Sequence, residues 1–313
     1  FIRGVNIDAF IRNGQNFFTE LAIYADGSFN CWGGVDRAFL HKKFQQGWIR
    51  SSVPDGETIS AHQIGAFTVE DGQWTRSPAQ LHQHMLQLLD ALNPEHTDLI
   101  DFEGSDVIIR NNVRYAKLGM MRAHPVRTMD DRSPVRGVRR VLFSKHDDQW
   151  WLGPIGLYAD RMADIHPHPA HQHLISVDEF FERVHGGTIS STVPDGARLN
   201  ICDLGTITVR DAQFWVEPDS LIKELRDAVN QLCGEESVDH RFYRIWKAYL
   251  LDPTPNGRQQ VRDAYEAVPR HRRMYLGDMD TRDRLICAII STDQEPSAAL
   301  LSDARDGYRY LLS

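Results

Sequence analysis

The sequence predicts an α+β fold built from two tandem homologous modules, each a small, mainly antiparallel sheet with packed helices, plus a C-terminal helical region. The main observation is an internal repeat: residues 47–93 recur as residues 187–233 without a gap, at a constant offset of 140, and 15 of the 47 positions are identical. Within each copy, short β-rich runs separated by turn residues lead into an amphipathic helix. The last 79 residues instead place apolar side chains at helical spacing.

The repeat sets the expected domain boundaries. A chain of 313 residues is long enough for two or three domains. We expect module 1 at residues 1–100, a basic linker at 101–137, module 2 at 138–234 and a helical subdomain at 235–313.

Module 1 is expected to begin with a β-hairpin near Phe17, in which Asp26 and Gly27 form the turn between two short strands. A short amphipathic helix over residues 35–44 follows, and Gly47 is placed to end it.

The repeated core comes next and predicts three strands, at residues 48–53, 58–62 and 66–70. Pro54-Asp55-Gly56 predicts a turn, because proline fixes φ at the second turn position and glycine accepts a positive φ. Asp71-Gly72 predicts a second turn. Ser77, Pro78 and Gln80 then predict a capping box at the start of a helix that packs on the sheet.

Module 2 is expected to repeat this order from Val138, with a hairpin turn at residues 146–148. This hairpin lies at an offset near 120 from the hairpin near Phe17, whereas the helix that follows, residues 175–184, keeps the offset of 140. The difference predicts an insertion of about 20 residues at 154–173, in the form of a loop.

Composition and charge narrow the class of protein. Residues 101–140 carry a net charge of +4 and residues 141–234 carry −7, within a total of −8. An acidic second module disfavours nucleic acid and suits a basic protein partner, or is ordinary solubilising charge.

No apolar run reaches the roughly 20 residues that a membrane helix needs. The first residues show no secretory pattern and the four cysteines are scattered, so we expect a cytoplasmic protein with reduced thiols.

Four histidines in the expected insertion form a candidate metal site, because imidazole is a common ligand of zinc, copper and nickel. They are His166, His168, His171 and His173, and Asp164 is the nearby carboxylate. The alternative is a polar surface loop with adventitious metal affinity, which the short spacing and the two interrupting prolines favour.

A second candidate is the pair Asp278 and Asp280, which could hold a divalent ion or serve as acid and base. The alternative is that Asp280 caps a helix. His62 could pair with Asp55, but its counterpart in the second copy is Cys202, which excludes a symmetric catalytic histidine.

Phosphate-binding, nucleophile-elbow, zinc-protease and zinc-cysteine motifs are absent from the sequence, so no catalytic residue and no cofactor is predicted. Most of the seven tryptophans are expected in the core, and any that are exposed would be interface anchors. They are Trp32, Trp48, Trp74, Trp150, Trp151, Trp215 and Trp246.

Two segments carry a resemblance to known proteins. The first runs from Tyr24 through Gly47 to Val69, with its Trp-Gly-Gly and Val-Pro-Asp-Gly motifs, and the second covers residues 265–283. Both are similar to bacterial domains of uncharacterised function, and proteins of this kind resemble the immunity proteins of polymorphic toxin systems, such as Rhs or type VI effectors. The resemblance implies a cytoplasmic protein that binds a toxin and occludes its active site.

The hypothesis is therefore an immunity protein, not an enzyme, that neutralises a cognate secreted toxin, a protein partner expected to be basic. Its candidate contacts are the acidic and histidine side chains of module 2: Asp160, Asp164, His166, His168, His171, His173, Asp178, Glu179 and Glu182. The alternative is a metal-dependent hydrolase, or an enzyme that reverses a toxin's modification, using the histidine-rich loop or the pair Asp278 and Asp280.

Overall fold

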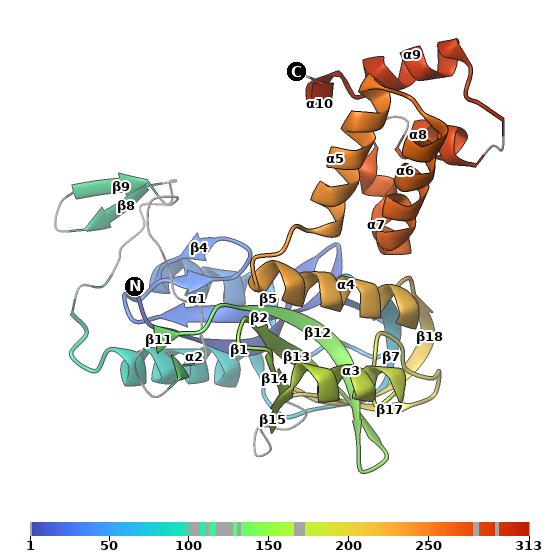
Figure 1. Ribbon diagram of the computed structural model, residues 1–313. Helices are drawn as coiled ribbons and strands as arrows, with labels where there is room; N and C mark the ends of the chain where they lie inside the picture. The colour runs from blue at the N-terminus through green and yellow to red at the C-terminus, as the bar shows by residue number, and fades with distance from the viewer. Residues whose placement is uncertain are drawn as a thin grey trace. The chain divides into compact units, whose positions relative to one another are not determined.

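The chain forms two units, Phe1–Trp215 and Val216–Ser313. A computed structural model describes the chain at residues 2–97, 99, 107–110, 113–116, 128–129, 133–165, 173–277, 282–291 and 294–312 (Figure 1).

The first unit carries both β-rich modules. The elements of the first module are β1 (Gly4–Asn13), β2 (Gln15–Tyr24), β3 (Phe29–Asn30), β4 (Gly34–Val35), α1 (Arg37–Gln45), β5 (Ile49–Arg50), β6 (Thr58–Ala61), β7 (Gly65–Trp74) and α2 (Pro78–Leu92). Those of the second are β12 (Gly137–His146), β13 (Gln149–Tyr158), β14 (Met162–Ile165), β15 (His173–Ser176), α3 (Val177–His185), β16 (Ile189–Ser190), β17 (Arg198–Ile201) and β18 (Gly205–Phe214). In the expected linker, two short hairpins are described, β8 (Val107–Arg110) with β9 (Val113–Ala116) and β10 (Thr128–Met129) with β11 (Ser133–Pro134).

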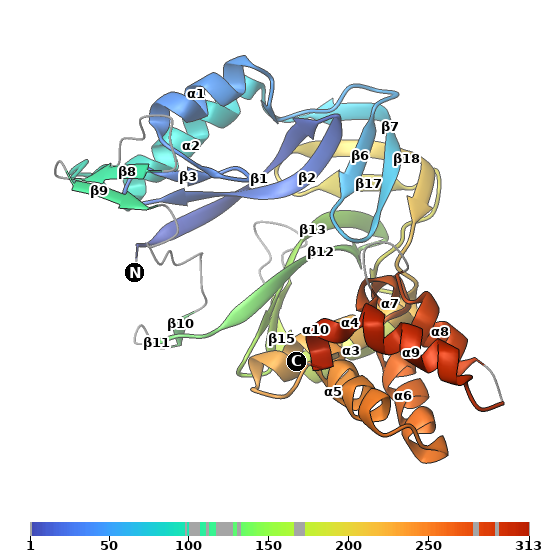
Figure 2. The same cartoon turned by 90° about the horizontal axis from the view of Figure 1, so that it is seen from above.

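The hairpin of β1 and β2 positions the site. Its tight turn is centred on Gly14, whose φ of 77° suits glycine, because Asn13 still pairs with Gln15. Alternate residues of β1, Ile7, Ala9 and Ile11, belong to one core cluster with the buried side chains of α1 and α2. Figure 2 shows both helices on the same side of this hairpin. The intervening residues of β1 therefore face the opposite side of the sheet.

The repeated core folds largely as the sequence predicts. The turn at Pro54-Asp55-Gly56 is confirmed: the amide of Glu57 donates to the carbonyl of Pro54 at 3.1 Å, and Gly56 has φ 82°. Its counterpart at residues 194–197 repeats the same hydrogen bond. Gly47 follows α1 with a positive φ, as expected.

The capping box of α2 is also confirmed. The Gln80 amide donates to Ser77 Oγ at 3.3 Å, and the Ser77 amide donates to Gln80 Oε1 at 2.8 Å. We expect Ser77→Ala to lower the free energy of unfolding by about 1 kcal/mol, because the backbone N–H of Gln80 at the helix start loses its acceptor. Glu217 stands at the equivalent repeat position and makes no capping hydrogen bond, so Glu217→Ala is the matched control. Urea denaturation of both variants tests this, and equal losses would contradict it.

The two modules share one sheet, which corrects the expectation of a separate small sheet in each. Among the described residues, fourteen strands form a single sheet in which β7 pairs antiparallel with β18. The pairing is symmetric: Val69 lies opposite its own repeat equivalent Val209. Thr75 N donates to the carbonyl of Leu204 at 2.9 Å, and the equivalent bond runs from Trp215 to Ile64 at 3.1 Å. The duplicated modules thus pair as an intramolecular dimer, because each would otherwise expose an edge strand.

The Asp71-Gly72 turn was a wrong prediction. β7 continues to Trp74, and the equivalent positions in β18 also stay within the strand. Asp71 and Asp211 have φ of 51° and 50°, and the β7–β18 register shifts beside them. These residues form a β-bulge, because the local left-handed conformation bends the strand without reversing it.

The prediction of a loop insertion at 154–173 was also wrong. The hairpin of β12 and β13 is the equivalent of β1 and β2, at offsets of 133 and 134, and β13 extends to Tyr158. Residues 162–165 then form β14, which pairs with β13 as β3 pairs with β2. The change of offset from 134 to 140 leaves about six extra residues between β14 and β15.

The second unit is helical, as expected. Its elements are α4 (Pro218–Leu232), α5 (Val238–Leu251), α6 (Pro255–Ala267), α7 (Arg270–Arg273), the 3-10 turn η2 (Met274–Leu276), α8 (Arg284–Ile290), α9 (Ala298–Gly307) and α10 (Arg309–Leu312). α4 is the repeat equivalent of α2. Trp246 is fully buried in the core of this unit, and the Asp227 carboxylate accepts from the Val238 amide at 2.9 Å and pairs with Arg272 at 3.3 Å.

Candidate functional site

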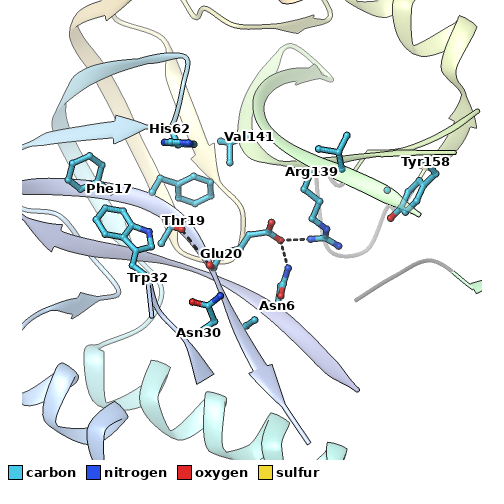
Figure 3. Close-up of a pocket in the computed structure, with 14 residues that line it drawn as sticks. Asn6, Phe17, Thr19, Glu20, Asn30, Trp32, His62, Arg139, Val141 and Tyr158 are labelled. Atoms are coloured by element: carbon cyan, nitrogen blue, oxygen red, sulfur yellow. Dashed lines mark hydrogen bonds and ion pairs between the residues drawn. The ribbon is translucent and has the colours of Figure 1, made fainter. Parts of the chain in front are cut away.

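A cavity of about 770 Å³ lies in the first unit, where the hairpins of the two modules approach each other. Module 1 lines it with residues of β1, β2, β3 and the β6–β7 turn, and module 2 lines it with residues of β12 and β13 (Figure 3). Cavities of this size bury a drug-sized ligand or a short peptide.

The cavity lies beside a gap in the sheet. Along one edge, β2 pairs with β6 up to Phe18 and with β3 from Ala22. Within the described residues, Thr19, Glu20 and Leu21 have no strand on that edge. Trp32 and His62 stand on either side of this gap, beside β3 and after β6.

An ion pair across the two modules forms the polar centre of the cavity. Glu20 Oε1 accepts from Arg139 Nη1 and from Asn6 Nδ2, the latter at 3.2 Å (Figure 3). The side chains of Glu20 and Arg139 are only 17% and 28% exposed. Partial burial strengthens this pair relative to a surface salt bridge, because less water screens it.

This centre occurs once although the modules are duplicated. β1 and β12 align at an offset of 133, so Asn6 and Arg139 are equivalent positions, and both donate to Glu20. The equivalent of Glu20 in β13 is Pro154, which is buried. The duplicated strands are therefore arranged symmetrically, but their side chains have diverged, so the ion-pair centre is asymmetric.

Trp32 carries the clearest sign of strain. Its φ is 63°, a left-handed conformation that bulky residues rarely adopt, and the residue is 50% exposed. The indole packs edge-on against Phe17, with ring centroids 4.9 Å apart, and against Trp48 at 6.4 Å. An exposed aromatic residue held in a strained backbone at a cavity is a functional candidate rather than a core residue.

Asp8 lies directly opposite Glu20 in the β1–β2 register. Burial raises the pKa of Asp8 to about 7, and the charges of Glu20 and Asp203 add to the rise, while a hydrogen bond with Cys202 and the charge of Arg139 oppose it. Asp8 Oδ1 is buried and has no hydrogen-bond partner among the described residues. Burial also raises the pKa of the Cys202 thiol well above its usual value. The thiol is therefore not activated as a nucleophile.

The predicted contact residues lie elsewhere. Asp178, Glu179 and Glu182 are exposed on α3, where Glu179 pairs with Arg183 at 2.7 Å and Asp178 approaches Arg161 at 3.7 Å. Asp160 is exposed in the β13–β14 turn.

One of these predictions needs correction. Asp164 is only 4% exposed, because it lies in the central part of β14, so it cannot add charge to a surface. His166, His168, His171, Asp278 and Asp280 lie outside the described residues, as does the side chain of His173 at the start of β15.

In the part of the chain that the structure describes, no three His, Cys, Asp or Glu side chains group so as to hold a metal ion. No described helix is long and apolar enough to cross a membrane. All four cysteines are free thiols.

Of the predicted contact residues whose side chains the structure describes, none lines the cavity. The sequence did offer two signals for it. Asn13-Gly14 between alternating apolar residues is a strong hairpin signal. Trp32 next to Gly33-Gly34 places an aromatic residue in a segment suited to unusual backbone angles.

Fold and cavity together define a duplicated α+β protein with an asymmetric cavity between the hairpins of its two modules. The chain belongs to the family described as Domain of unknown function (DUF7638), whose model matches residues 1–96 and 125–236. A second model, Domain of unknown function (DUF7639), matches residues 237–305. The two matched stretches of the first family agree with the two modules. No curated protein and no solved structure matches the chain.

Proposed function

We propose that the chain is a non-catalytic binding protein and that a segment of a protein partner enters the cavity between the two module hairpins. The observation that carries this proposal is the asymmetric centre formed by Glu20, Arg139 and Asn6 in a cavity of about 770 Å³. A partly buried ion pair stabilises a fold poorly compared with apolar packing, so its presence beside exposed aromatic surface suits recognition better than stability.

Neutralisation of a secreted toxin, as the sequence resemblance implies, is the role that we propose for this binding. An inserted toxin segment would be held away from its own substrate, in the way that large complementary surfaces block an active site. The exposed acidic side chains Asp178, Glu179 and Glu182 on α3 are a separate proposed contact with a basic partner. Asp178 and Glu179 are close to arginines of the same unit, which reduces the negative potential that these carboxylates offer to a basic partner.

Filling the cavity tests the proposal. Thr19 lines the cavity from β2, and Thr19→Trp should fill part of it and abolish partner binding. Gln15→Trp, at the exposed start of the same strand, is the matched control and should bind as the wild type does. The three proteins are immobilised, incubated with lysate of the cells from which the chain comes, and the retained proteins are quantified by mass spectrometry.

One stoichiometric protein that the wild type and Gln15→Trp retain and Thr19→Trp loses would support the proposal. Circular dichroism and the Tm of Thr19→Trp establish that it is folded. Equal retention by all three proteins would place the binding surface elsewhere, and the α3 carboxylates would be reversed next.

A further inference from the structure

The aromatic wall of the cavity indicates one chemical feature of its occupant. Phe17 and Trp32 form an edge-to-face pair at one end and Tyr158 stands at the other. Trp32 is held by Phe17 and Trp48, so its half-exposed indole is presented with little conformational freedom left to lose. Rigid aromatic anchors of this kind favour a flat apolar group over a flexible aliphatic chain.

The polar centre indicates a second feature. Glu20 and Arg139 neutralise each other, so the cavity does not select a strongly charged ligand. Glu20 Oε1 accepts from both Asn6 and Arg139, and a guanidinium has five donors, so the pair offers a carboxylate acceptor next to N–H donors. A group with a donor and an acceptor side by side, such as a peptide amide, complements this arrangement.

The gap in the sheet indicates a third feature of the occupant. Thr19, Glu20 and Leu21 have no strand on their outer edge within the described chain. Because backbone groups alternate between the two edges of a strand, the N–H and C=O of Glu20 point outward, and this carbonyl also accepts from Thr19 Oγ1 at 3.4 Å. An extended peptide can pair with such an edge. The equivalent gap in β13 lies at Gly153-Pro154, where proline supplies no donor.

We propose that the cavity binds an extended peptide segment with an aromatic side chain, whose backbone amide meets the Glu20–Arg139 pair and whose ring packs on Trp32 and Phe17. This inference rests on the proposed function and names the chemistry of the inserted segment. The asymmetry of the two modules makes the expected stoichiometry one segment per chain.

The test uses small blocked peptides as probes. N-acetyl-tryptophanamide and N-acetyl-leucinamide carry the same amides and differ in the side chain, whereas indole and adenosine are flat rings without a peptide. Isothermal titration at neutral pH should show binding of N-acetyl-tryptophanamide at one site per chain. Trp32→Ala should weaken that binding roughly tenfold through lost ring packing. Glu20→Gln should weaken it roughly fivefold, because a charged acceptor becomes neutral.

Trp215→Ala is the matched control, since Trp215 is 52% exposed and does not line the cavity; it should bind the probe as the wild type does. Tighter binding of N-acetyl-leucinamide, or equal loss in Trp215→Ala, would overturn the aromatic assignment. Binding of indole or adenosine as tight as that of the blocked peptide would overturn the amide assignment. If no probe binds while a partner is captured in a manner that Thr19→Trp abolishes, this inference fails and the proposed function stands.

Discussion

Replacing Gly65 with alanine should break the junction between the two modules. Gly65 lies opposite Phe214 where β7 pairs with β18, and an added Cβ would come within 2.5 Å of the Gln213 carbonyl oxygen and 2.4 Å of the Phe214 ring. Backbone at one contact and a packed ring at the other leave little room for adjustment. We expect Gly65→Ala to lower the free energy of unfolding by about 2 to 3 kcal/mol, the upper part of the range for overpacking, because one of the two contacts is backbone.

Gly205, the repeat equivalent of Gly65, is equally crowded. A Cβ on Gly205 would lie 2.3 Å from the Gln73 carbonyl oxygen, and its φ of 154° adds strain. The two glycines stand at opposite ends of ten-residue strands, about 30 Å apart. Their effects should therefore add in the double variant.

Gly33→Ala is the matched control, because a Cβ there meets nothing within 4 Å and the backbone angle is ordinary. Urea denaturation followed by fluorescence measures all four proteins. A Gly65→Ala protein as stable as Gly33→Ala would contradict the β7–β18 junction. Since the cavity is lined from both modules, probe binding should fall together with stability in Gly65→Ala and Gly205→Ala.

The repeat made much of the fold predictable. Wherever the offset of 140 holds, from α1 to α2 and from α3 to α4, the order of elements was expected, because turn and capping residues such as Pro54 and Ser77 act locally. The first hairpin was misplaced because its two copies have diverged and keep a different offset. The β2–β3 pair was consequently matched with β12–β13 instead of with its true equivalent. The shared sheet was not foreseen, because edge pairing of two modules leaves no local sequence pattern.

The site was predictable in fewer respects. Glu20 and Arg139 are far apart in the sequence, and the pairing of the two modules through β7 and β18 brings their strands to one cavity. Spacing rules detect ligands that share a helix or a loop, so the sequence indicated the histidine cluster and not the cavity. Any exposed tryptophan was expected to be an anchor, and both Trp32 and Trp215, which are 50% and 52% exposed, meet that condition; of the two, Trp32 lines the cavity.

Asp8 makes the stability of the first unit depend on pH. The folded-state pKa of about 7 exceeds the ordinary value of 3.8, chiefly because the carboxylate is buried. Between those two values the folded chain binds a proton that the unfolded chain has released. The free energy of unfolding therefore falls as pH rises from about 4 to about 7, and this contribution is constant above pH 7. The difference between 3.8 and about 7 sets an upper limit of about 4 kcal/mol for the loss.

Asp8→Asn should remove this dependence, because the amide resembles the protonated carboxyl and cannot ionise opposite Glu20. We expect the variant to be more stable than the wild type by up to about 4 kcal/mol at pH 8 and by only about 1 kcal/mol at pH 4.5. Asp303→Asn, at an exposed position of α9, is the control and should follow the wild type at both pH values. Urea denaturation at the two pH values gives the comparison. A difference between Asp8→Asn and the wild type that is the same at both would show that the Asp8 carboxyl does not titrate in this range. It would also mean that water reaches the cavity face of β1 more readily than the burial of Asp8 Oδ1 indicates.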